Sequence, residues 1–391
     1  MQNKQTITRR EMLLKTGKAV SLMGLLTTFE HNAFGQDTVP KPRIISHTTG
    51  WYFGWPTVGI RKNGELLVVS SGMREEHVCP FGAVDLIRSH DGGETWTWHQ
   101  TLYDGPIDDR DSGICVTSRG TILVTTFTSL AYEPILKRAE AADAAGHPIW
   151  PKERLLKWQG VHNRISAEQR QNELGCWMIR STDGGVTWSQ RYSSIVNSPH
   201  GPSQLSDGRL LYAGKKLWED SAVGVCQSTD DGQTWQWLAS IPERDGDREE
   251  EYHELHQVEA ANGDIIVQIR NHNKVNDQEN LQTESSDGGK TWSKPHTIGV
   301  WGIPSFLMRL KDDRLMMTYG HRRVPLGVQA RLSTNNGGTW SEPIVLYGDG
   351  VSGDLGYPST VQQADGSLLT VWYEAIQGKC VLQMLKWPLP S

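Results

Sequence analysis

Residues whose side chains can bind anions or transfer protons recur at two positions of a unit that this chain repeats. Six units each contain two strand-like runs joined by a turn. Counting nine residues back from each turn gives Trp55, Asp111, Pro199, Glu254, Pro304 and Tyr357. Seven to ten residues past the turns come Arg74, Lys215, Lys216, Arg270, His272, His321, Arg322, Tyr373 and Glu374. The recurrence predicts a ligand site, and the alternative is a solvated polar rim.

These side chains together predict chemistry on an acidic ligand. Clustered arginines bind a carboxylate in bidentate fashion. A tyrosine hydroxyl is a poor nucleophile near neutral pH, because its pKa is about 10. A nearby glutamate can accept the tyrosine proton during an attack, so a Tyr–Glu pair is chemically competent.

The repeated units predict the elements that position these residues. Their turns are at Gly64, Gly120, Gly208, Gly263, Asp313 and Gly366, and six strand pairs predict the six blades of a β-propeller. In a blade the innermost strand lines the axis. If it starts at one mouth, the second strand returns there, and the turn between strands three and four lies at the opposite face.

A second repeat supports the same fold. Five octets contain Gly followed two or three residues later by Thr-Trp, at 89–96, 181–188, 228–235, 285–292 and 333–340. Asp in the octet caps backbone N–H groups and Gly accepts positive φ, so each octet predicts a tight turn. We expect all five at the face opposite the site.

Two segments complete the predicted ring. The strand-like run 42–48 is expected to finish the last blade and remove its free edge. Residues 128–172 are rich in helix formers and are expected to be a partly helical insertion or lid over the site, with Arg154, His162 and Arg164 facing the pocket. The alternatives are a degenerate seventh blade, a surface excrescence or a contact to a second subunit.

The N-terminus and the composition indicate where the protein acts and which partners it has. Residues 1–36 contain Arg9-Arg10 before a short apolar run and predict a twin-arginine export signal, hence a periplasmic or secreted bacterial protein, with residues 37–391 forming the propeller. The net charge of −6 predicts neither a nucleic acid nor an anionic membrane as partner. The five cysteines show no metal-ligand spacing, so we expect buried thiols, no metal and no cofactor. The oligomeric state is left open.

The octets resemble the Asp-box, or BNR repeat, of the sialidase (neuraminidase) superfamily, which implies a six-bladed propeller. The segment 354–359 resembles the one that carries the nucleophilic Tyr of exo-sialidases, here Tyr357. By the same resemblance Glu254 would activate Tyr357, Arg270 and Arg322 would bind the substrate carboxylate, Arg74 would contact a sugar hydroxyl, and Glu374 would steady the first arginine.

Two departures from that family matter. Sialidases carry Arg-Ile-Pro at the first inner strand, whereas this chain has Gly54-Trp55-Pro56, so the first arginine is missing. The acid/base Asp expected after Arg74 is also missing. Asp111 is our candidate for the acid and Arg110 for the lost arginine, with Glu76 and His77 as competitors.

Three functions follow from these observations and stay open at this stage. The first is a retaining exo-glycosidase that cleaves a terminal α-linked acidic sugar, with Trp55, His77 and His200 among the substrate-binding residues. The second is a polysaccharide lyase that acts on uronic acids, using Tyr357 with His200, His256 or His321. The third is a sugar-binding propeller without turnover. All three predict a carbohydrate partner.

Overall fold

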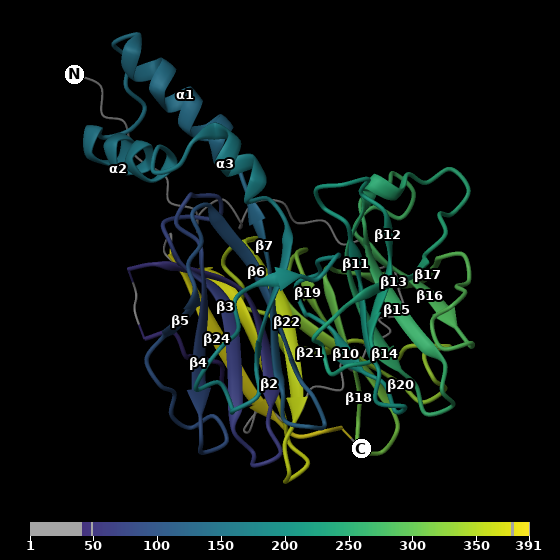
Figure 1. The fold of residues 1–391 in the computed structure, drawn as a ribbon. Coiled ribbons are helices and arrows are strands. Elements are labelled where there is room, and N and C mark those ends of the chain that lie inside the picture. The colour runs from purple at the N-terminus through teal and green to yellow at the C-terminus, as the bar shows by residue number, and fades with distance from the viewer. Residues whose placement is uncertain (1–40, 48–49, 377–378, 391) are drawn as a thin grey trace, which may run out of the picture. The chain divides into compact units, whose positions relative to one another are not determined.

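The computed structural model describes residues 41–47, 50–376 and 379–390, and these form a six-bladed β-propeller (Figure 1). Each blade is a four-stranded antiparallel sheet. The inner strands are apolar on both faces because neighbouring blades cover both; residues Leu66, Leu67, Val68 and Val69 of one such strand are at most 1 % exposed. The predicted fold class is confirmed.

The blades follow one another in chain order. The first comprises β2 (Tyr52–Ile60), β3 (Leu66–Arg74), β4 (Ala83–Ser89) and β5 (Gln100–Tyr103). The second comprises β6 (Asp108–Val116), β7 (Ile122–Ser129), β8 (Cys176–Ser181) and β9 (Tyr192–Ser193). The third comprises β10 (Ser203–Gln204), β11 (Leu210–Lys215), β12 (Val223–Ser228) and β13 (Gln236–Ser240). The fourth comprises β14 (Tyr252–Glu259), β15 (Ile265–Asn271), β16 (Glu279–Ser285) and β17 (His296–Trp301), preceded by the 3₁₀ turn η1 (Glu249–Glu251). The fifth comprises β18 (Ser305–Arg309), β19 (Leu315–His321), β20 (Gly327–Ser333) and β21 (Ile344–Tyr347).

The sixth blade joins the two ends of the described chain. It contains β22 (Leu355–Gln362), β23 (Leu368–Ile376), β24 (Lys379–Trp387) and β1 (Arg43–Ile44). Arg43 pairs with Met384 and Ile44 with Gln383. The prediction that the 42–48 segment closes the ring is therefore confirmed, and the edge of β24 is covered as a closed propeller requires.

Each octet begins at the last residue of the third strand of a blade. In the first octet, Asp91 accepts hydrogen bonds from the backbone N–H and the hydroxyl of Thr95, the latter at 2.6 Å. The Gly92 carbonyl accepts a hydrogen bond from the Gln363 side chain, in the turn between β22 and β23 of the neighbouring blade. The octets therefore join blades at the turn face, as predicted.

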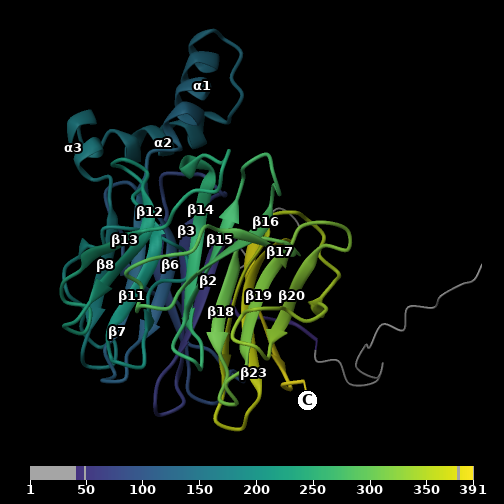
Figure 2. The same cartoon turned by 90° about the vertical axis from the view of Figure 1, so that its right-hand side faces the viewer.

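The insertion between β7 and β8 forms three helices, α1 (Glu133–Ala144), α2 (Lys152–His162) and α3 (Ala167–Asn172). Figure 1 and Figure 2 both show the three helices together, beyond one end of the propeller strands. Tyr132, Leu136 and Trp158 are at most 1 % exposed and pack in one cluster with Cys79. A helical insertion, and not a seventh blade, thus occupies this segment.

The helices support the loop after β3 and do not line the pocket described below. The Glu75 carboxylate accepts hydrogen bonds from Lys157 at 2.5 Å and from the Trp158 indole at 2.8 Å. Arg154 pairs with Glu76 at 2.6 Å.

The prediction that three charged residues of the insertion face the pocket is wrong. Arg154 bonds to the loop, the His162 ring lies 3.3 Å from the Tyr132 hydroxyl, and Arg164 donates to the carbonyls of Gly105 and Pro106. Arg154 and Arg164 thus attach the insertion to loops of the propeller, and His162 contacts the insertion itself.

Three further predictions concern the export signal, the cysteines and membrane-spanning helices. The predicted export signal lies outside them. All five cysteines are buried free thiols, as expected. Within the described ranges, no helix combines the length and apolarity that a membrane crossing needs.

Candidate functional site

Three inner strands carry the same distortion at the mouth of the propeller. Trp55 in β2, Asp111 in β6 and Tyr357 in β22 have φ values of 54°, 46° and 52°. Each lies where the pairing with the second strand shifts by a bulge. Positive φ is unfavourable for these residue types, and a bulge re-aims a side chain. The common backbone geometry therefore presents the three side chains to one place.

The hydroxyl of Tyr357 is bound from two sides. It donates to Glu254 Oε1 at 2.5 Å and accepts from Arg270 Nη1 at 2.9 Å. Arg270 Nη1 also donates to Glu254 Oε2 at 2.6 Å. Glu254 and Arg270 of the fourth blade and Tyr357 of the sixth thus form one triangle. In it Glu254 can accept a proton from Tyr357 while Arg270 stabilises the charge that develops.

The electrostatics of the triangle favour that assignment. Burial, and next the Glu254 carboxylate, raise the pKa of Tyr357 well above its ordinary value, so the phenol stays protonated. Burial by itself would raise the pKa of Glu254, but the Arg270 guanidinium and the Tyr357 hydrogen bond outweigh it and lower that pKa. Glu254 is therefore an ionised acceptor at neutral pH.

Asp111 has the opposite environment. It is 7 % exposed, and its Oδ1 has no hydrogen-bond partner in the described part of the chain. Burial raises the pKa of Asp111 to about 7, although Arg110 opposes the rise, and Glu254 adds to it. Two carboxylates whose pKa values are driven apart are the pattern of an acid and a base in one site.

Trp55 occupies the position of the missing arginine. The guanidinium carbon of Arg110 lies 4.5 Å from the centroid of its ring, and the His77 ring meets it edge-on at 5.0 Å. His77 is held by Tyr52, 2.8 Å from Nδ1, and by Asp354, at 3.2 Å. Arg110 therefore lies beside Trp55, where it can contribute a positive charge.

Arg322 closes the opposite side. Its Nε donates to the Leu355 carbonyl at 3.0 Å, and its guanidinium carbon lies 5.8 Å from the Tyr357 ring centroid. No hydrogen bond among the described residues uses its two terminal nitrogens. The pocket between these groups has a volume of about 400 Å³ and is lined by Trp55, His77, Val78, Arg110, Asp111, Phe127, Ser129, Ala131, Glu254, Arg270, Arg322 and Tyr357.

The sequence of residues 133–370, more than half of the chain, matches the BNR repeat-like domain family. This chain belongs to that family. No curated protein sequence matches it.

Solved structures of other propellers are similar to this BNR repeat-like protein in fold. A protein of unknown function from Dyadobacter fermentans is 22 % identical, with a TM-score of 0.70 over 90 % of this chain and 98 % of that one. A NanB sialidase variant from Streptococcus pneumoniae is 13 % identical, with a TM-score of 0.61 over 89 % and 70 %. A Trypanosoma rangeli sialidase in a covalent intermediate with 2,3-difluorosialic acid is 16 % identical, with a TM-score of 0.57 over 86 % and 54 %. At these identities the likeness shows the fold.

The structure brings most of the predicted site residues of this protein together. The residues that meet in the pocket are Tyr357, Glu254, Asp111, Arg110, Arg270, Arg322, Trp55 and His77. Their roles in binding and catalysis remain predictions. Glu76, the other competitor for the acid, bonds to the insertion and lies outside the pocket lining.

Arg74 does not belong to the pocket, which corrects its assignment as a sugar-binding residue. It is 0 % exposed. Its two terminal nitrogens pair with the Asp108 carboxylate at 2.7 and 3.0 Å. Asp108 lies three residues before Asp111 and holds the Arg74 guanidinium below the pocket mouth. There the guanidinium cannot reach a ligand.

Replacing Arg74 with methionine is expected to destabilise the fold by about 3–5 kcal/mol, since it leaves the Asp108 carboxylate buried without its partner. Chemical denaturation of the variant measures this loss. The double variant Arg74→Met/Asp108→Asn is the control and should recover part of it. Unchanged stability with weakened ligand binding would instead return Arg74 to the binding site.

Two further assignments are corrected. Glu374 is 0 % exposed and accepts hydrogen bonds from Gln383, Val351 N–H and Tyr347. Side chains alternate along β23, so Glu374 faces Tyr347 of the fifth blade while its neighbour Tyr373 faces Trp55 of the first. His200 is 1 % exposed, and its ring lies 6.4 Å from that of Tyr357, outside the pocket lining.

The histidines of the lyase alternative also lie outside the lining. His256 stacks on Phe306 at 4.6 Å, and His321 Nδ1 lies 2.9 Å from the Pro325 carbonyl. Of the histidines in the described ranges, His77 alone lines the pocket that contains Tyr357. The geometry therefore provides no partner from the proposed lyase set.

Four residues that line the pocket were not predicted from the sequence. Val78, Phe127, Ser129 and Ala131 line the pocket at the end of β7 and in the loop after β3. Apolar and small residues at a strand end give no functional pattern, so nothing distinguished them. Asp354 was noted only as part of the Tyr357 segment, whereas it accepts from Tyr52 and Tyr373 and orients His77.

Proposed function

We propose that this protein is a retaining exo-glycosidase that cleaves a terminal α-linked acidic sugar. The observation that carries the proposal is the Tyr357–Glu254–Arg270 triangle, which faces a pocket that also contains Arg110, Arg322 and Asp111. Below pH 7 Asp111 is mostly protonated, so the three arginines outweigh one ionised carboxylate. Such a pocket favours an anionic ligand.

The reaction uses two steps that balance in atoms and protons. Tyr357 Oη bonds to the anomeric carbon while its proton passes to Glu254, and the glycosidic C–O bond breaks as Asp111 protonates the leaving oxygen. Water then attacks the anomeric carbon and gives one proton to Asp111, while the released Tyr357 oxygen takes its proton back from Glu254. A phenol nucleophile avoids the repulsion between a carboxylate and an acidic sugar.

A substrate screen tests the proposal. Aryl glycosides of several α-linked acidic sugars are incubated with the protein, and released sugar and the configuration of the first product are followed by NMR. We expect release with retained configuration. An unsaturated product that absorbs in the ultraviolet would support a lyase, and binding without turnover of any compound would support a sugar-binding propeller.

The absence of the first arginine predicts the order of substrates. Trp55 changes both charge and shape where a carboxylate would be held, and loss of one bidentate contact costs about 1.5–3 kcal/mol. The kcat/KM for an N-acetylneuraminic acid glycoside should therefore be about 10- to 100-fold below that for the best other acidic sugar. Equal or better cleavage of the sialoside would mean that Arg110 replaces the lost contact fully.

The cellular setting is also a proposal. The paired arginines at positions 9 and 10 and the apolar run after them support export by the twin-arginine route. An exported glycosidase would meet glycans in the periplasm or outside the cell. The export of a reporter fused to residues 1–36, with Arg9 and Arg10 replaced by lysine as the control, tests this proposal.

A further inference from the structure

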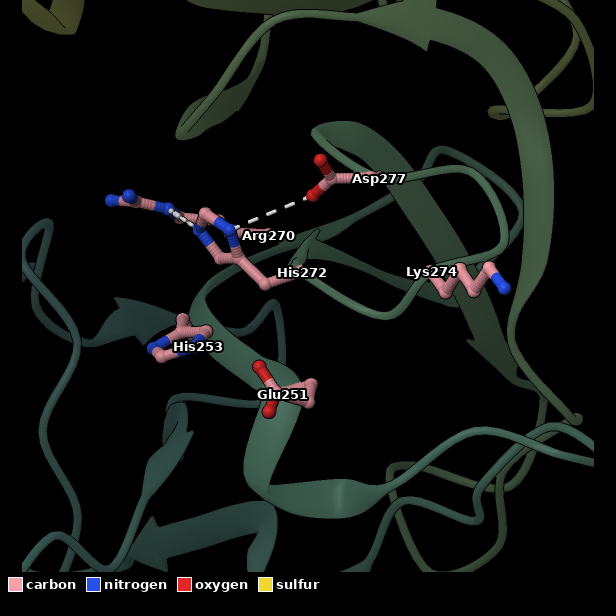
Figure 3. Close-up of a pocket in the computed structure, with 6 residues that line it drawn as sticks. All are labelled: Glu251, His253, Arg270, His272, Lys274 and Asp277. Atoms are coloured by element: carbon pink, nitrogen blue, oxygen red, sulfur yellow. Dashed lines mark hydrogen bonds and ion pairs between the residues drawn. The ribbon is translucent and has the colours of Figure 1, made fainter.

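Arg270 bonds to His272 as well as to Tyr357 and Glu254. Arg270 Nε donates a hydrogen bond to His272 Nε2 at 2.8 Å (Figure 3). A guanidinium has no acceptor and does not lose its proton in proteins. Nε2 must therefore carry a lone pair, and His272 is the neutral imidazole with its proton on Nδ1.

His272 is open to solvent through a second cavity, which shares Arg270 with the Tyr357 pocket. This cavity has a volume of about 720 Å³ and is lined by Glu251, His253, Arg270, His272, Lys274 and Asp277. The His272 side chain is 28 % exposed, and its Nδ1 lies 3.7 Å from the Asp277 carboxylate. Protons from solvent can therefore reach His272 directly through this cavity.

Some charged groups around His272 raise its pKa and others lower it. Arg270 opposes a positive charge on the ring, while Asp277, Glu251 and Glu254 favour one. His253 meets the ring edge-on at 4.7 Å, and Lys274 lines the same cavity. Burial and then Arg270 prevail, so the pKa of His272 lies below its ordinary value and the ring is neutral at neutral pH.

The orientation of Arg270 links His272 to the nucleophile. The guanidinium is planar, and its Nη1 holds both Tyr357 and Glu254 while its Nε is held by His272. A proton on Nε2 would replace the acceptor with a donor and place a second positive charge beside the guanidinium. Arg270 would then lose its Nε bond and turn from Tyr357 and Glu254.

We propose that His272 is a positioning residue that holds Arg270 against the Tyr357–Glu254 pair only while its imidazole is neutral, so that protonation from the adjoining cavity switches the site off. This inference rests on the proposed function for its effect on turnover. The contact itself does not depend on that function.

The pH profile of a matched pair of variants tests the switch. In His272→Gln, the amide oxygen can accept from Arg270 Nε but does not titrate, so kcat at neutral pH should stay within about threefold of wild type and the acid limb of the profile should move to lower pH. His272→Ala should lower kcat about 10- to 100-fold, since Arg270 is no longer held. His253→Gln, on the same cavity but not bonded to Arg270, should keep the wild-type acid limb. An unchanged acid limb in His272→Gln would overturn the proposal.

Nitrogen NMR of the labelled wild-type protein tests the contact without any substrate. The His272 signals, assigned by their loss in His272→Gln, should show an unprotonated Nε2 and a protonated Nδ1 at neutral pH. The opposite tautomer, or a charged ring, would overturn the inference whether or not turnover is found. Absence of turnover on every acidic sugar, with the expected tautomer present, would count against the proposed function and leave the positioning contact in place.

Discussion

Replacing Tyr357 with phenylalanine is expected to abolish turnover and covalent trapping while leaving the fold intact. Only a hydroxyl is lost, and the ring keeps its edge-on contact with Trp55 and its place beside Tyr373. The hydroxyl is the group that Glu254 and Arg270 both hold. Removing a nucleophile should lower kcat by about 10³-fold or more.

Mass spectrometry after incubation with a fluorinated acidic sugar measures the effect. Wild type should gain the mass of one sugar on the peptide that contains Tyr357, and the variant should gain none. Tyr373→Phe is the matched control, because its ring lies 5.8 Å from that of Tyr357 and its hydroxyl donates to Asp354 rather than to Glu254. This control should still be trapped. Sustained turnover by Tyr357→Phe would require a different nucleophile or an elimination.

The second large effect is expected from Asp111→Asn. An amide cannot protonate the leaving oxygen, so glycosides with poor leaving groups should lose about 10²–10⁴-fold in kcat, and activated aryl glycosides much less. In wild type, kcat/KM should fall as pH rises above about 7, where the raised pKa of Asp111 is passed. That alkaline limb should vanish in the variant.

Glu76→Gln serves as the control, because Glu76 bonds to Arg154 outside the pocket. It should keep both the activity and the alkaline limb. A limb that survives in Asp111→Asn but disappears in Glu76→Gln or His77→Gln would move the acid to one of those residues.

The same variant should also change stability, with a sign set by the raised pKa. The Asp111 carboxyl ionises near 3.8 in the unfolded chain and near 7 in the folded one. Between these values the unfolded state releases its proton first, so wild type loses stability relative to Asp111→Asn as pH rises through this window, by up to about 4 kcal/mol. Thermal unfolding of both proteins at pH 4 and pH 8 measures the difference. A buried carboxylate kept at such a cost is expected at a functional site.

The repeats in the sequence were sufficient to predict the six blades, the closing strand and the octets at the turn face. Each depends on local chemistry: Gly turns at a constant distance from apolar runs, and an Asp that caps its own octet. Because these patterns recur along the chain and propeller topology has few solutions, the mouth residues could be listed from spacing alone. The meeting of Tyr357, Glu254 and Arg270 follows from that spacing.

Only the tertiary structure decided which residues at the correct spacing face the pocket. Arg74 is buried because the Asp108 carboxylate, on the next blade, is within reach of both its terminal nitrogens, and Glu374 lies on the face of β23 that packs against the fifth blade. The unusual pKa of Asp111 and the hydrogen bond from Arg270 to His272 also depend on burial and on the direction of single side chains. Spacing determines where a residue lies along a strand, but rotamers, bulges and partners from other blades determine what its side chain touches.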